Sequence, residues 1–342
     1  MFSRGSAIRP MARWALMLLT VVGQPAWSQV SAVATPDRLT LDYRLSAREL
    51  APGVYAVEGA VEDFTLRNGC NIINTGFIAT EAGAVVINTG PSRLYGQQLR
   101  ALIRRTTGAE PAAVVHLNLH PDYFLGNQAF ADVPRHATAS TAAGIRREAA
   151  SYETNLFRLC GDWMKGTETV HPDRDLSSAV QAGTWTVGGR TFDLLELAGH
   201  TDSDLVLMDR RSGVVFAGGL VFFERVPTTP HARVAEWQDS LRQLQQRSGW
   251  AQALAKGWVV PSHGPVHRGP QGLEQTLRFL TWLDEHFRTA AGQGWDMNDL
   301  LRAPVPAPFR DWAAFSTEYV RNVAHLYPRY EKAALSPGRP GR

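Results

Sequence analysis

The stretch HLNLHPDYFLGN, residues 116–127, decides the fold, because it places histidine and aspartate directly after a short apolar segment. That segment, residues 112–116, predicts a buried strand. Loops at the ends of strands are where a rigid scaffold presents reactive side chains. Imidazole and carboxylate groups together form a common ligand set for zinc. His120 and Asp122 are therefore the first candidate site residues.

Three further loops follow segments that also predict strands. AGHTDSD, residues 198–204, contains His200, and PSHGP, residues 261–265, contains His263. FAGGL, residues 216–220, has glycine rather than a polar side chain at Gly219. Strands are expected over residues 54–58, 71–80, 84–88, 112–116, 184–187, 191–197, 205–209, 213–217 and 258–261, and helices over 92–106, 146–163, 234–246, 272–288 and 311–326. Strand-rich halves that are each followed by helices predict a layered α/β sandwich.

The order of these loops resembles the metallo-β-lactamase-fold hydrolases. Shorter matches resemble one subgroup, the exported quinoprotein relay system metallohydrolases. They are Asn74-Thr-Gly-Phe, Thr89-Gly-Pro-Ser-Arg, Phe124-Leu-Gly-Asn-Gln-Ala-Phe, Gly161-Asp-Trp-Met and Pro227-Thr-Thr-Pro-His231. The resemblance implies a four-layer αβ/βα sandwich with a helical C-terminal extension. It also implies association with quinoprotein dehydrogenase systems, without fixing a substrate.

Residue patterns together with the resemblance divide the chain into five expected parts. We expect a signal peptide over 1–28, a linker over 29–49 and a metallo-β-lactamase-like domain over 50–268. A C-terminal helical extension over 269–335 and a flexible tail over 336–342 complete the chain.

The family's metal motifs match this chain only in part. Four ligand positions keep a ligand residue, namely His120, Asp122, His200 and His263. Three are substituted, namely Asn118, Tyr123 and Gly219. The supporting aspartate that the family places after a Val-Ile pair is Asn88 here.

Loss of three ligands, one of which would bridge the two metals, argues against a dinuclear site. One zinc ion held by the four retained residues is the expectation, and a site without metal is the alternative. With zinc, the ion would lower the pKa of a bound water, and Asp122 would orient that water and accept its proton. The expected activity is hydrolysis of an ester, thioester or amide. The alternative is a non-catalytic periplasmic binding protein that uses the old pocket.

Two other histidines are candidates for supporting roles. His116 lies too far along the predicted strand to replace Asn118, so a packed or hydrogen-bonded histidine is expected. His231 is either a pocket residue, as the subgroup resemblance implies, or an ordinary turn histidine.

The charge of the chain is explained by its N-terminus. The 342 residues carry 35 Lys and Arg against 32 Asp and Glu, a net charge of +3. Residues 1–28 hold three arginines and no acid, followed by an apolar run and a small-residue cleavage pattern typical of an export signal. Cleavage leaves 32 basic and 32 acidic residues. We therefore expect a periplasmic or secreted protein with a small-molecule ligand, without nucleic-acid binding and without a membrane anchor after cleavage.

Cys70 and Cys160 are the two cysteines of the chain. In an exported protein such a pair is a disulfide candidate, but two buried free thiols fit the sequence equally well.

Overall fold

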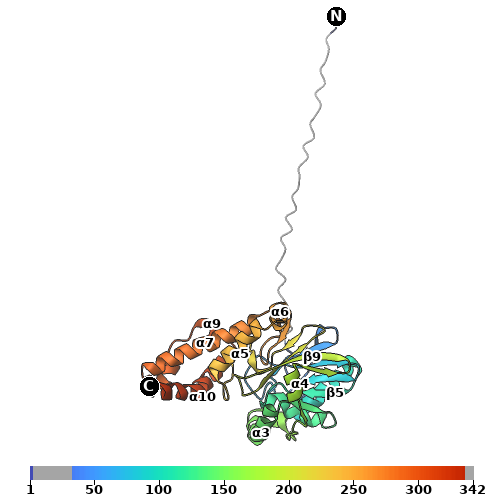
Figure 1. Ribbon diagram of the computed structural model, residues 1–342, viewed down its shortest axis with the longest axis horizontal. Coiled ribbons are helices and arrows are strands. Elements are labelled where there is room, and N and C mark those ends of the chain that lie inside the picture. The colour runs from blue at the N-terminus through green and yellow to red at the C-terminus, as the bar shows by residue number, and fades with distance from the viewer. Residues whose placement is uncertain (3–32, 336–342) are drawn as a thin grey trace. The chain divides into compact units, whose positions relative to one another are not determined.

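The computed structural model describes residues 1–2 and 33–335, and residues 33–335 form one compact unit (Figure 1). The predicted cleavage site and the predicted tail at 336–342 lie outside the described residues. Within those residues, no helix combines the length and the apolar character that crossing a membrane requires.

Seven strands form the first sheet in chain order. They are β1 (Arg48–Ala51), β2 (Val54–Val57), β3 (Thr75–Thr80), β4 (Gly83–Ile87), β5 (Pro111–Val115), β6 (Arg135–Ala137) and β7 (Arg174–Asp175). β1 to β4 pair antiparallel, whereas β4 to β7 pair in parallel. Parallel neighbours need a crossover, and α1 (Arg93–Thr107) supplies the one between β4 and β5.

Six strands form the second sheet, in the order β13-β12-β11-β10-β9-β8. They are β8 (Thr184–Val187), β9 (Arg190–Leu197), β10 (Asp204–Asp209), β11 (Val215–Phe216), β12 (Trp258–Val260) and β13 (His267–Arg268). Every residue of β10 is buried, as expected for a central strand that is covered on both faces.

Apolar clusters define four layers. One cluster joins side chains of both sheets, including Ile78 and Val115 from the first and Leu207 and Phe216 from the second. A second packs α1 and α3 (Ala139–Cys160) on the outer face of the first sheet. A third packs α5 (Val234–Gln246), α6 (Trp250–Lys256) and α7 (Gln271–Gly292) on the outer face of the second. The predicted αβ/βα sandwich is confirmed.

The remaining helices include the C-terminal extension. α8 (Met297–Arg302), α9 (Ala307–Arg310) and α10 (Phe315–Leu335) follow α7, and Figure 1 shows α7 and α10 side by side at one end of the body. The short elements elsewhere are α2 (Pro121–Phe124), α4 (Ser177–Ala182) and the 3-10 turns 125–130, 161–164 and 218–220.

Three predicted helices differ in length from the observed ones. α7 continues to Gly292, beyond the predicted end at residue 288. α3 begins at Ala139, where Thr138 caps the helix by accepting a hydrogen bond from the backbone of Thr141, rather than at residue 146. α10 continues to Leu335 through Pro328, although proline normally ends a helix. Tertiary contacts compensate: the Tyr327 hydroxyl donates to the Trp295 carbonyl at 2.7 Å, and Arg329 donates to the Ala232 carbonyl at 2.8 Å.

Cys70 and Cys160 form a disulfide, with 5.9 Å between their Cα atoms. Of the two readings that the sequence left open, the structure thus shows the bonded one. The bond joins the loop before β3 to the C-terminal end of α3.

Candidate active site

The loop after β5 is held by two asparagines. The side-chain oxygen of Asn88 accepts a hydrogen bond from the Leu117 N–H at 3.0 Å. The side-chain oxygen of Asn118 accepts one from the His120 N–H at 2.9 Å. Asn88 adopts a left-handed backbone conformation with φ of 57°, which asparagine tolerates better than most residues. Asn88 therefore positions the loop that carries His120 and Asp122.

The amide nitrogen of Asn118 points away from the loop toward residues 201–204. It donates to the Thr201 hydroxyl at 3.2 Å and to the carboxylate of Asp204. The other oxygen of Asp204 accepts from the Thr201 N–H at 2.8 Å. Asn118 is fully buried and ties two site loops together.

Gly219 lies beside this network. A Cβ atom built there would collide with the His200 ring, the Asp204 carboxylate and the Asn118 amide. The side chains of neighbouring loops thus fill the space that a larger residue at 219 would need.

His200 is fully buried between loops and aromatic rings. Its Nδ1 lies 3.4 Å from the Asp204 carboxylate, and its Nε2 lies 3.4 Å from the Thr228 hydroxyl. The ring packs at 5.0 Å from Trp237, centroid to centroid. Gly199, with φ of 147°, passes so close to the Trp237 backbone that no side chain fits.

His263 faces Asp122. Its Nδ1 donates to the Ile72 carbonyl at 2.8 Å, which leaves Nε2 without a proton when the ring is neutral. Nε2 lies 3.6 Å from Asp122 Oδ2. Asn74 fixes the loop by donating to the carbonyls of Pro261 at 3.0 Å and Gly264 at 2.7 Å.

His120 forms a second pair, with His231. Its Nε2 lies 3.1 Å from His231 Nδ1, so one of the two nitrogens carries the shared proton. The ring of His200 lies edge-on to that of His120, with 4.7 Å between centroids. Burial lowers the pKa values of both His120 and His231, and the neighbouring histidines lower that of His120 further.

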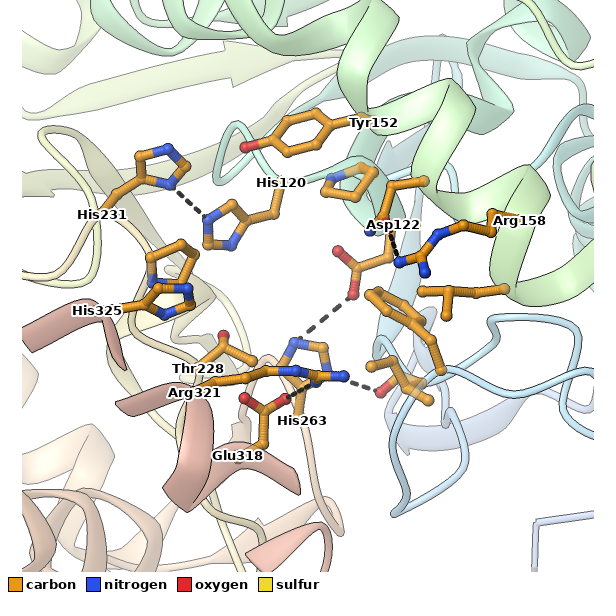
Figure 2. Close-up of a pocket in the computed structure, with 16 residues that line it drawn as sticks. His120, Asp122, Tyr152, Arg158, Thr228, His231, His263, Glu318, Arg321 and His325 are labelled. Atoms are coloured by element: carbon orange, nitrogen blue, oxygen red, sulfur yellow. Dashed lines mark hydrogen bonds and ion pairs between the residues drawn. The ribbon is translucent and has the colours of Figure 1, made fainter. Parts of the chain in front are cut away.

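These two pairs open onto a cavity of about 360 Å³ (Figure 2). Phe64, Ile72, Pro121, Leu159 and Pro230 form its apolar lining. His120, Asp122, His231 and His263, all predicted, lie on its wall. His116, Asn118, Tyr123, His200, Gly219 and Asn88 are not among the lining residues.

The sequence prediction missed seven polar lining residues, of which Thr228 lies in a loop and the other six lie on two helices. Tyr152, Asn155 and Arg158 come from α3, and Glu318, Arg321 and His325 come from α10. The residues of each set are three or four positions apart, which places them on one face of the helix. A polar face on each helix could therefore have been predicted from the sequence. Nothing in the sequence shows that the two faces meet across a cavity.

Ion pairs attach α10 to the sandwich. Arg225 is fully buried and donates to Glu318 Oε1 at 3.1 Å. Arg321 pairs with Asp63 at 2.9 Å and with the same Glu318 oxygen at 3.1 Å. Because these side chains are in or beside the lining, the helix is a fixed wall of the cavity.

Asp122 combines deep burial with a carboxylate oxygen that forms no hydrogen bond within the described part of the chain. It is 2% exposed, and its Oδ2 atom has no hydrogen-bond partner. Burial raises its pKa to about 7, against smaller opposing effects of a backbone hydrogen bond and the charge of Arg225. A carboxyl group with such a pKa can both hold and accept a proton near neutral pH.

His116 and Tyr123 are buried behind the cavity. His116 Nδ1 lies 3.2 Å from the Tyr123 carbonyl, and burial lowers the pKa of the ring to about 3. Burial raises the pKa of the Tyr123 phenol well above its usual value, which opposes the ionisation that metal binding needs. His116 is thus the packed histidine that its spacing predicted.

The four predicted metal ligands do not gather around one point. Asp122 and His263 approach each other, whereas His120 turns toward His231 and His200 toward Asp204 and Thr228. In residues 1–2 and 33–335 no three His, Cys, Asp or Glu side chains are placed to hold one metal ion.

Two packed sheets with helices on both outer faces, and a polar cavity at the loop ends, define the class of αβ/βα sandwich proteins. The sequence profile of the metallo-beta-lactamase superfamily matches residues 68–263, more than half of the chain. The chain belongs to the metallo-beta-lactamase superfamily.

Solved structures agree with this fold. A metallo-beta-lactamase from Pontibacter korlensis is 22% identical, with a TM-score of 0.54 over 70% of this chain and 99% of its own. One from Hirschia baltica is 17% identical, with a TM-score of 0.54 over 69% and 97% of the two chains. FIM-1 from Pseudomonas aeruginosa, solved in a mono-zinc form, is also 17% identical, with a TM-score of 0.54 over 69% and 95%. No curated protein sequence matches.

Proposed function

We propose that this chain is an exported hydrolase that binds a small molecule in the cavity and cleaves an ester, thioester or amide bond. Superfamily membership supports hydrolytic chemistry in general. The observation that carries the proposal is the buried Oδ2 of Asp122, which lacks a partner and belongs to a residue of the cavity wall.

The Asp122–His263 pair supports proton transfer. His263 Nε2 and Asp122 Oδ2 are both acceptors when the ring is neutral and the carboxyl is ionised, so their 3.6 Å approach is favourable only with a proton or a polar group between them. In the proposed reaction a water bound there attacks the substrate carbonyl while Asp122 takes its proton. The bond between the carbonyl carbon and the leaving group then breaks, and Asp122 returns the proton to the departing alcohol, thiol or amine. Tyr152 and His231 line the same cavity and would contact the substrate.

A catalytic zinc fits this site poorly. A catalytic zinc takes three protein ligands. Asp122 and His263 are close enough to each other to share a metal ion, but they supply only two side chains. Asn118 and Gly219 take part in packing between loops, which supports the view that the family's metal motif is degraded here. The proposed reaction therefore does not use a metal ion. The experiment below tests whether activity depends on zinc.

The experiment is hydrolysis of a panel of nitrophenyl esters by protein purified without chelator. We expect turnover that survives EDTA and falls roughly 100-fold or more in Asp122→Asn, the size typical of losing a general base. Asp239→Asn, an exposed change on α5, is the matched control. Turnover lost in EDTA and restored by zinc would instead support a metal route. No turnover above buffer would overturn the hydrolase proposal in favour of a binding protein.

Export and the dehydrogenase association rest on the sequence. The N-terminal pattern at 1–28 supports export, and the motifs from Asn74 to His231 support the quinoprotein relay subgroup. Fractionation with N-terminal sequencing should find a periplasmic or secreted chain that begins at Gln29. Deletion of the gene should lower quinoprotein dehydrogenase activity in cell extracts, measured with an artificial electron acceptor, and an unchanged activity would contradict the association.

A further inference from the structure

Two arginines line the cavity, a third contacts the lining residue Glu318, and the charges of the three guanidinium groups are balanced differently. Arg225 is buried and paired with Glu318. Arg321 is paired with both Asp63 and Glu318. Arg158, on α3, forms no ion pair within the part of the chain that the structure describes, and its one side-chain partner is the neutral Asn155, at 2.9 Å. Arg158 is thus the cavity cation whose charge the protein itself leaves unmatched.

Arg158 is placed to meet a ligand. It lines the cavity together with Asp122, and Figure 2 shows its guanidinium reaching in from α3, with the α10 residues on another side. One of its nitrogens donates to Asn155, which leaves further N–H groups for a second acceptor. Arg158 is itself exposed to solvent, and the lining residues Leu159, Phe64 and Pro121 provide apolar surface for the rest of a ligand in the same cavity.

The disulfide fixes this arrangement at the C-terminal end of α3. Cys160 follows Leu159 directly, and its disulfide holds the end of α3 against the loop of Ile72, another lining residue. The position of the Arg158 backbone relative to Asp122 is therefore set by covalent structure as well as by packing.

We propose that Arg158 binds a carboxylate group of the substrate, so that the ligand of this cavity is a small organic acid whose hydrolysable carbonyl lies toward Asp122. A guanidinium pairs with a carboxylate through two parallel hydrogen bonds, which orients the ligand as well as attracting it. The inference rests on the proposed function only in using the same cavity as the substrate site. Arg158 is a binding residue in this proposal and takes no part in bond breaking.

The test is binding without turnover. Phenylacetate and phenylacetamide have nearly the same shape and differ in charge, and their affinities are measured by titration calorimetry on the full chain. We expect phenylacetate to bind wild-type protein more tightly than phenylacetamide. Arg158→Gln should weaken phenylacetate roughly tenfold and leave phenylacetamide nearly unchanged. Arg158→Lys should keep most of the preference, and added salt should reduce it.

The control is Arg146→Gln, which removes the same charge from an exposed position on the same helix outside the cavity lining. It should behave as wild type. Phenylacetate that binds no better than phenylacetamide, or not at all, would overturn the proposal, as would an equal loss in both glutamine variants. Because binding is measured, Arg158-dependent affinity without esterase activity would refute the hydrolase proposal and leave the carboxylate-binding role of Arg158 standing.

Discussion

Removal of the Cys70–Cys160 disulfide should cost this protein a large part of its stability. Both cysteines are fully buried, and the bond closes a segment with a sequence separation of 90. In the chain-entropy description, a loop of that length restricts the unfolded state by about 4–5 kcal/mol. For a chain of this size, that is a fall of roughly 10 °C in the unfolding temperature.

The assay is thermal and urea unfolding of wild type and of Cys70→Ser/Cys160→Ser, each with and without dithiothreitol. Oxidised wild type should be the most stable sample. Reduced wild type should approach the double variant, and the variant itself should not respond to the reductant. Equal unfolding temperatures for oxidised wild type and the variant would refute the reasoning, as would two titratable thiols in denatured wild type that has not been reduced.

Three further changes test other parts of the structure. Gly219→Ala should destabilise the fold by roughly 1–3 kcal/mol, because the new Cβ atom would collide with His200, Asp204 and Asn118. Gly292→Ala is the control, since a Cβ atom there meets no atom of the described residues within 4 Å and should not destabilise the fold. Thermal unfolding compares the two variants. Glu318→Gln should cost about 3–5 kcal/mol in urea unfolding, since it leaves the buried Arg225 charge without its partner, and Arg225→Met/Glu318→Met should cost less than the single change; the reverse order would contradict the explanation. Burial raises the pKa of Asp209, but hydrogen bonds from Arg190 and Ser212 outweigh this effect and hold the pKa in the folded protein below 3.8. The ion pair with Arg190 therefore stabilises the fold above pH 3.8, and its contribution is lost as the pH falls through the folded pKa. The stability difference between wild type and Asp209→Asn should therefore be largest near neutrality and narrow below about pH 4, and urea unfolding at several pH values that showed a constant difference would count against it.

The sequence was most informative where function depends on short local patterns. The loop residues His120, Asp122 and His263 follow strands that apolar runs in the sequence predict. Their convergence at one edge of the sandwich could therefore be predicted. The orientation of each side chain could not be predicted in the same way. The resemblance predicts Asn118 and His200 at ligand positions of the family. Their contacts with Thr201, Asp204 and Thr228 instead depend on how the loops pack together.

The cavity wall formed by α10 could not be predicted from the sequence either, because it depends on contacts between residues far apart in the chain. Helical spacing predicts α10, but the sequence does not indicate that Glu318 and Arg321 reach Arg225 and Asp63, far earlier in the chain. The expected domain boundaries, including the start of the extension at 269, stay predictions. The end expected at residue 326 was too early, because the tertiary hydrogen bonds of Tyr327 and Arg329 offset the effect of Pro328.

The attachment of α10 has an evolutionary consequence. The superfamily match ends at residue 263, whereas Glu318, Arg321 and His325 belong to a later helix. The loops within the superfamily match and the cavity wall formed by α10 can therefore be inherited separately. Substitutions at the exposed edge of α10 could diversify ligand preference among descendants of one ancestor while the older loops stay constant, provided that the Arg225–Glu318 anchor is kept.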